Sequence, residues 1–181
     1  TELARAAMYR GADVTLVAGH MDVDPPMFVK CVEAESAEDM YNEVSSIAPY
    51  MDIIIKAAAV ADYTPVKTAD HKIKKSDGDM SIELKRTKDI LKYLGETRRN
   101  GQFICGFSME TENLVENSTK KLKKKNVNMI CANSLNTEGA GFGTDTNIIS
   151  VITADGVKEL PLLSKFETAN AILDEIKNRL N

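Results

Sequence analysis

Residues 52–63 read DIIIKAAAVADY, and this stretch decides the fold. The continuous apolar run at 53–55 is typical of a central parallel strand that is buried on both faces. The small residues that follow, through Ala61, form the predicted end of this strand and let a ligand approach the backbone closely. Asp62 then stands where an acidic side chain can hold a sugar hydroxyl or a nucleobase amine, although a turn or cap residue fits the same position.

Helical and strand-like patterns alternate on both sides of this stretch. Helices are expected at 2–10, 37–48, 88–99, 112–125 and 165–180, strands at 13–18, 28–32, 52–55, 103–107 and 128–132, and a hairpin at 147–153 and 157–162. This alternation predicts an α/β domain with a Rossmann-like, doubly wound, mainly parallel sheet. Because ligands bind at the carboxyl ends of such strands, residues 57–63 and 107–111 are expected to belong to the site.

Residues 72–86, KIKKSDGDMSIELKR, interrupt the alternation. Two arms of alternating polar and apolar residues flank Asp77-Gly78, which predicts an inserted β-hairpin arm that acts as a flap or a dimer contact. The lysines at 72, 74 and 75 fit a clamp for a triphosphate. They fit equally well a solvated edge strand that lysines protect from aggregation.

Composition limits the class of protein. A chain of 181 residues predicts a single domain, 1–181, and its net charge of −4 disfavours a general binder of nucleic acid or of membrane surfaces. The cysteines, Cys31, Cys105 and Cys131, have no metal-ligand spacing, so we expect free, buried thiols in a cytoplasmic protein. An α/β domain normally has a strand before its first helix, and we expect that strand and its loop to be missing from this sequence.

Three further segments each allow a ligand or a structural explanation. Lys121 and Lys125 share one helix face and suit an anion, but a solvated face explains them too. Phe107 ends a buried strand and either flanks a base or packs in the core. The start of the 88–99 helix, where Thr87 is the expected cap, offers backbone amides to an anion or simply caps the helix. There is no GxGxxG or GxxxxGK[ST] motif in the sequence.

Several motifs occur in a specific order: AAAVADY, KIKK, TKDIL, CGFSMET, KLKKKNVNMICAN and GFGTDTN. This ordered set resembles phosphopantothenate–cysteine ligase, usually the C-terminal half of a bifunctional coenzyme A biosynthesis protein. The resemblance covers essentially the whole chain. It implies a homodimer that uses CTP, 4′-phosphopantothenate and L-cysteine and forms an acyl-cytidylate, with Mg²⁺ accompanying CTP. It also implies fusion to, or pairing with, phosphopantothenoylcysteine decarboxylase. FMN would bind to that decarboxylase and not to this chain.

The resemblance also implies roles for particular residues. Lys72, the first lysine of KIKK, would be the catalytic lysine, and no metal ligand is assigned. The implied CTP contacts are Lys56, Ala57, Ala58, Asp62, Lys72, Lys88, Asp89, Ile90, Leu91, Phe107, Lys121 and Lys125. Lys56 and Lys88 stand where relatives often have glycine and proline, so contacts there would be made through the backbone. The family's glycine-rich turn and its asparagine-containing loop would precede Thr1.

Two other classes of function remain open at this stage. One is a Rossmann-type NAD(P)-dependent oxidoreductase, which the missing GxGxxG motif disfavours. The other is a non-catalytic nucleotide-binding or dimerisation module.

Overall fold

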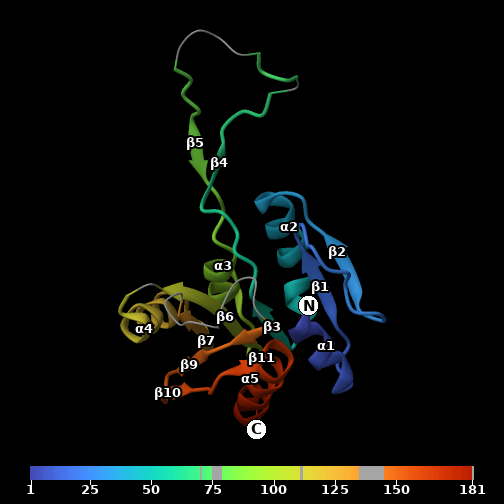
Figure 1. The fold of residues 1–181 in the computed structure, drawn as a ribbon, viewed down its shortest axis with the longest axis vertical. Coiled ribbons are helices and arrows are strands. Elements are labelled where there is room, and N and C mark those ends of the chain that lie inside the picture. The colour runs from blue at the N-terminus through green and yellow to red at the C-terminus, as the bar shows by residue number, and fades with distance from the viewer. Residues whose placement is uncertain (70, 75–78, 111, 135–144, 181) are drawn as a thin grey trace.

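The computed structural model describes residues 1–69, 71–74, 79–110, 112–134 and 145–180. In this part of the chain the main sheet has five strands in the order β10-β9-β7-β6-β3 (Figure 1). The strands are β3 (Ile53–Lys56), β6 (Phe103–Glu110), β7 (Met129–Ser134), β9 (Ile149–Thr153) and β10 (Gly156–Glu159). The first three are mutually parallel, whereas β9 runs antiparallel to β7 and forms a hairpin with β10.

The α/β class is therefore confirmed, but the main sheet of the described residues is mixed rather than mainly parallel, and it does not include the first two strands. β1 (Thr15–Ala18) and β2 (Lys30–Glu33) pair with each other in a parallel sheet of their own. β3 is consequently an edge strand here, and Ile53 is 38% exposed rather than buried on both faces. The strand also ends at Lys56, so the predicted continuation through the alanines is wrong.

Helices cover both faces of the main sheet and create two hydrophobic cores. On one face, α1 (Glu2–Tyr9) and α5 (Lys165–Leu180) pack over side chains such as Cys105 and Cys131. On the other, α2 (Ala37–Ile47), α3 (Ile90–Thr97) and α4 (Leu114–Lys125) pack over Ile104 and Ile130. This division follows from the alternation of side chains along each strand.

The cysteines are free thiols, as predicted, although their burial differs. Cys105 and Cys131 are fully buried with their Sγ atoms 3.7 Å apart, whereas Cys31 is only partly buried. The hydrogen bond with Cys105 and burial both raise the pKa of the Cys131 thiol.

A long arm projects from the carboxyl edge of the sheet (Figure 1). At its base, β4 (Tyr63–Pro65) pairs antiparallel with β5 (Leu84–Arg86). The predicted pairing within 72–86 is therefore wrong, since the partner of 84–86 lies before residue 72, and 72–74 form no strand. The Thr87 amide donates to the Asp62 carbonyl (3.0 Å) and the Thr87 hydroxyl to the Ala61 carbonyl (2.7 Å), which holds the two ends of the arm together. The predicted turn at 77–78 lies outside the described residues.

The remaining elements are short. They are η1 (Ala48–Tyr50), β8 (Thr146–Asn147) and β11 (Leu163–Ser164), with β8 and β11 paired antiparallel. The predicted positions of the helices are confirmed within a few residues, except that Asp89 rather than Thr87 caps α3.

Candidate active site

A cleft of about 540 Å³ lies at the carboxyl ends of the parallel strands β3, β6 and β7. It brings together every predicted nucleotide contact except Lys72. The cleft is lined by Lys56, Ala57, Ala58, Ala59, Val60, Asp62, Thr87, Lys88, Asp89, Ile90, Leu91, Phe107, Ser108, Met109, Lys121, Lys125, Asn133, Asn147 and Lys165. The expected site segment 57–63 contributes to this lining, as does the described start of 107–111. This position agrees with the rule that open α/β sheets bind ligands beyond their strand ends.

Three lysines converge on one side of the cleft, from the end of β3 and from α4. Burial lowers the pKa of Lys56, and repulsion from Lys121 lowers it further. Burial is also the main reason that the pKa of Lys121 is lowered, with Lys125 adding to the effect. The Lys121 Nζ donates to the Phe107 carbonyl at 3.0 Å, which holds it against the end of β6. The protein therefore keeps positive charge in a partly dehydrated place, where an anionic ligand would compensate it.

Asp89 links α3 to α4. Its Oδ1 accepts from the Lys92 amide at 3.0 Å as the N-cap of α3, and its Oδ2 accepts from Lys125. Burial by itself would raise the pKa of Asp89, but the hydrogen bonds from Lys125 and Lys92 outweigh it and lower that pKa. Of the three lysines, Lys125 is therefore paired with a carboxylate. Lys56 and Lys121 form no ion pair with any carboxylate of the described residues.

The alanine segment after β3 lines the cleft with small side chains. Residues 57–59 are exposed and present backbone to the cavity with only methyl groups beside it. Asp62 follows, at the base of the arm, where its carbonyl accepts from the Thr87 amide. A ligand can therefore lie directly along this backbone, as the small residues predicted.

Lys72 is separate from this group. It lies exposed on the arm and does not line the cleft. Lys74 is likewise exposed on the arm, and Lys75 lies outside the described residues.

Sequence reasoning missed a polar corner of the cleft made by Asn133, Asn147 and Lys165. These residues come from β7, β8 and the start of α5, which the registers of two strand pairs, β7–β9 and β8–β11, bring together. Asn133 and Asn147 are the last residues of the motifs KLKKKNVNMICAN and GFGTDTN, but no role was predicted for either. The β8–β11 pairing that places Lys165 beside them involves two-residue strands, which no periodicity reveals.

The described residues contain no group of three His, Cys, Asp or Glu side chains that could hold a metal ion. Within the same part of the chain, no helix is both long and apolar enough to cross a membrane.

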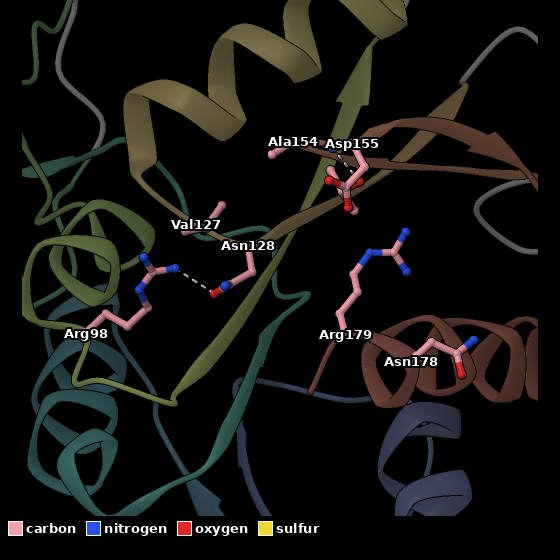
Figure 2. A pocket seen from close by; sticks show the side chains of 8 residues that line it. Arg98, Val127, Asn128, Ala154, Asp155, Asn178 and Arg179 are labelled. Carbon is pink, nitrogen blue, oxygen red and sulfur yellow. Dashed lines mark hydrogen bonds between the residues drawn. The ribbon is translucent and has the colours of Figure 1, made fainter. Parts of the chain in front are cut away.

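A second hollow lies at the opposite, amino-terminal edge of the sheet (Figure 2). There Asn128 accepts from Arg98 Nη1 at 2.8 Å and from the Ile104 amide at 2.9 Å. Arg179 Nη1 is occupied by Glu175, with the carboxylate 2.5 Å away. These polar groups serve the packing of α3, β7 and α5, and none of the predicted site residues lies among them.

Comparison with known proteins gives the family. The model of the family described as "DNA/pantothenate metabolism flavoprotein C-terminal domain" matches residues 1–180. The chain belongs to this family. Among curated members, the coenzyme A biosynthesis bifunctional protein CoaBC of Bacillus subtilis (strain 168) is 47% identical over 176 residues, which are 96% of this chain and 43% of that protein. CoaBC of Escherichia coli (strain K12) is 37% identical, over 98% of this chain and 44% of its own length.

Solved structures agree with this assignment. The crystal structure of a C-terminal domain of CoaBC superposes with a TM-score of 0.82 at 43% identity, covering 99% of this chain and 80% of that one. A DNA/pantothenate metabolism flavoprotein from Streptococcus pneumoniae shares the fold, with a TM-score of 0.80 at 20% identity. The ordered motifs of the sequence predicted the C-terminal part of a bifunctional coenzyme A biosynthesis protein, and this family assignment is confirmed. The chain spans less than half the length of the curated CoaBC relatives cited above.

Proposed function

We propose that this chain catalyses the CTP-dependent ligation of 4′-phosphopantothenate with L-cysteine through an acyl-cytidylate, a step of coenzyme A biosynthesis. The observation that carries the proposal is the cleft in which partly buried lysines, an exposed alanine backbone and Phe107 meet at the carboxyl edge of the sheet. Membership of the CoaBC C-terminal domain family supports it, since the relatives' printed name is that of a coenzyme A biosynthesis protein.

The chemistry has two steps. In the first, a carboxylate oxygen of 4′-phosphopantothenate attacks the α-phosphorus of CTP, and the bond to the leaving pyrophosphate breaks. In the second, the amine of cysteine attacks the acyl carbon, the bond from that carbon to CMP breaks, and the amine loses a proton to water. The protein contributes positioning and charge stabilisation rather than a covalent partner.

The residues of the cleft divide this work by position. Lys56, Lys121 and Lys125 supply positive charge to the phosphates, where charge grows as pyrophosphate leaves. Phe107 borders the base, and residues 57–58 and 88–91 contact the nucleotide partly through backbone groups. Asp62 binds the polar edge of the nucleotide, and Lys72 reaches the triphosphate from the arm.

Mg²⁺ would accompany CTP and share the phosphate charge. The cleft fits an ion held mainly by the phosphates, because Asp62 and Asp89 are its only carboxylates in the described lining and Lys125 already pairs with Asp89. We propose no protein ligand for this ion.

We further propose that the arm joins two copies of the chain in a homodimer. A partner or fused phosphopantothenoylcysteine decarboxylase would carry FMN, which has no place in the present chain.

Pyrophosphate release tests the proposal. We expect release that requires both CTP and 4′-phosphopantothenate, and amide product only when L-cysteine is added. A thermal-shift comparison of CTP, ATP and NADPH provides a second measurement, in which CTP should stabilise the protein most. Stabilisation by NADPH without CTP-dependent pyrophosphate release would refute the ligase.

A further inference from the structure

The polar corner of the cleft contains an unsatisfied buried acceptor. Asn133 is only 8% exposed, and among the described residues its Oδ1 has no hydrogen-bond partner. A buried polar atom without a partner destabilises the folded protein, so such an atom in a cleft wall indicates a ligand that donates to it. The side chain lies one alternation beyond Cys131 on the α5 face of β7, in register with Met109 of β6.

Asn147 and Lys165 add two donors to the same corner. The Oδ1 of Asn147 accepts from the Ile148 amide at 3.0 Å, so the group that this side chain can offer a ligand is its Nδ2 amide. Lys165 lies exposed at the start of α5 and contributes an ammonium group to the cleft lining. The strand registers place Asn133 opposite Ile149 and Asn147 opposite Leu163, and the Lys165 amide donates to the Asp145 carbonyl at 2.9 Å. All three residues therefore line the same cleft.

An α-amino acid has an amine that donates hydrogen bonds and a carboxylate that accepts them. The Oδ1 acceptor of Asn133 matches the amine, and the donors of Asn147 and Lys165 match the carboxylate. We propose that Asn133, Asn147 and Lys165 form the subsite for the L-cysteine substrate. The Oδ1 of Asn133 accepts an N–H of the amine, which directs the nitrogen lone pair toward the acyl carbon. The carboxylate of cysteine binds to Lys165 and to the Nδ2 group of Asn147.

The placement suits the order of the two steps. The cleft extends from the lysines of β3 and α4, on the α3 side of the sheet, to this corner on the α5 side. Phe107 and Met109, at the end of β6, line the cleft on the same face of the sheet as Asn133. The amine would therefore approach the acyl-cytidylate from the side opposite the phosphate-binding lysines.

This subsite rests on the proposed function, and the two can be tested separately. In the intact protein, the burst of pyrophosphate released without cysteine measures the first step alone. In Asn133→Leu and Lys165→Met we expect this burst to be unchanged, while the KM for cysteine rises about ten-fold or more. Lys177→Met, at the other end of the same helix, is the matched control and should leave both quantities unchanged.

Cysteamine, which lacks the carboxylate, isolates the role of Lys165. The wild-type preference for cysteine over cysteamine, measured as the ratio of kcat/KM values, should fall about ten-fold in Lys165→Met and be largely retained in Lys165→Arg. An unchanged preference in Lys165→Met, or a pyrophosphate burst lost in parallel with product formation, would overturn the subsite. Because Lys165 is exposed, this variant tests the subsite even if Asn133→Leu does not fold.

A binding measurement separates failure of the subsite from failure of the ligase. We expect calorimetric titration of the intact protein to detect L-cysteine binding that Lys165→Met weakens and Lys177→Met does not. A wild-type protein without any CTP-dependent burst would refute the proposed function, while the titration would still decide whether the corner binds cysteine. Equal cysteine affinity in the wild type and Lys165→Met would reject the subsite whatever the outcome for CTP.

Discussion

Lys56 and Lys121 hold positive charge in a place where burial disfavours it. Both have a lowered pKa, with burial as the first cause. In the unfolded chain these groups would titrate near 10.4, so the folded protein binds fewer protons than the unfolded one between the two pKa values. The sign follows from proton linkage: the free protein gains stability as the pH rises through this interval, because the strained charges are lost. The charged, partly buried lysines of the cleft therefore lower the stability of the ligand-free protein.

The same titration should weaken nucleotide binding. We expect the affinity for CTP to fall as the pH rises toward the ordinary lysine pKa of about 10.4, and to fall earlier than for ordinary lysines, because the neutral amines no longer attract phosphate. Calorimetric titration across this range measures the effect, and Lys121→Met should flatten the profile and lower the affinity at neutral pH. Lys120→Met, at an exposed lysine paired with Glu116, should leave the profile unchanged; a profile unaffected by Lys121→Met would contradict the assignment.

Lys72 allows a different test, because it lies on the arm and not in the cleft. We expect Lys72→Gln to slow acyl-cytidylate formation at least about 100-fold, since its charge would act on the departing pyrophosphate. Pre-steady-state pyrophosphate release measures this rate. Lys67→Gln, another exposed lysine of the arm, is the control and should have little effect. Equal rates for the two variants would show that the arm lysine is not catalytic.

How far the site was predictable depends on the sequence separation of its parts. The spacing of Lys121 and Lys125 on one helix face, and the position of residues 57–58 after an apolar run, place them at the sheet edge from local rules alone. Asn133, Asn147 and Lys165 meet only because short strands pair in a particular register. Such pairing is a tertiary property, and a single sequence contains no local signal for it.

At the scale of elements, the cleft depends on the close approach of α3 and α4. A Cβ on Gly95 of α3 would lie 1.7 Å from the Lys125 carbonyl oxygen at the end of α4. The Asn126 side chain also donates to the Gly95 carbonyl, at 2.9 Å. Glycine thus lets the backbones approach so that Asp89 at the start of α3 can reach Lys125.

We expect Gly95→Ala to lower the free energy of unfolding by about 1–3 kcal/mol, even though alanine favours helix more than glycine does, because the methyl group must displace α4. Chemical denaturation measures the change, and CTP affinity should fall with it as Lys125 moves. Gly19→Ala is the comparison, since its Cβ would meet nothing closer than 3.8 Å. A Gly95→Ala protein as stable as wild type would show that the helices can separate at no cost.

Elements themselves were predicted better than their pairing. Apolar periodicity located the helices from α1 to α5 because each buries one face. The arm was misassigned, since alternation around Asp77-Gly78 imitates a hairpin, while the described pairing joins 63–65 to 84–86 across a long connection. Periodicity reports which side of a strand is apolar and does not report its partner.

At the scale of the whole molecule, the arm is the part whose described apolar side chains are not packed into a hydrophobic core. Its described apolar side chains, Val66, Ile73, Met80, Ile82 and Leu84, are each between 38% and 62% exposed. Contacts with a second copy would bury them, and this is the physical basis for the proposed dimer.

We therefore expect the intact protein to be a dimer by light scattering coupled to gel filtration, and Ile82→Asp to shift it toward monomer. Val157→Asp provides the control, because Val157 is 44% exposed on β10, far from the arm in the fold. A wild-type monomer at working concentration, or a dimer unaffected by Ile82→Asp, would contradict this role of the arm.

The open side of β3 has a consequence for the handling of the protein. Its outer edge pairs with no strand in the described residues, yet the strand is a run of three isoleucines. An unpaired apolar edge is a template on which further chains can add as strands, the first event of aggregation. We expect residues 1–181 produced alone to form thioflavin-positive aggregates on mild heating. Ile53→Lys, at the exposed isoleucine of this strand, should delay them, and an unchanged lag time would show that aggregation starts elsewhere.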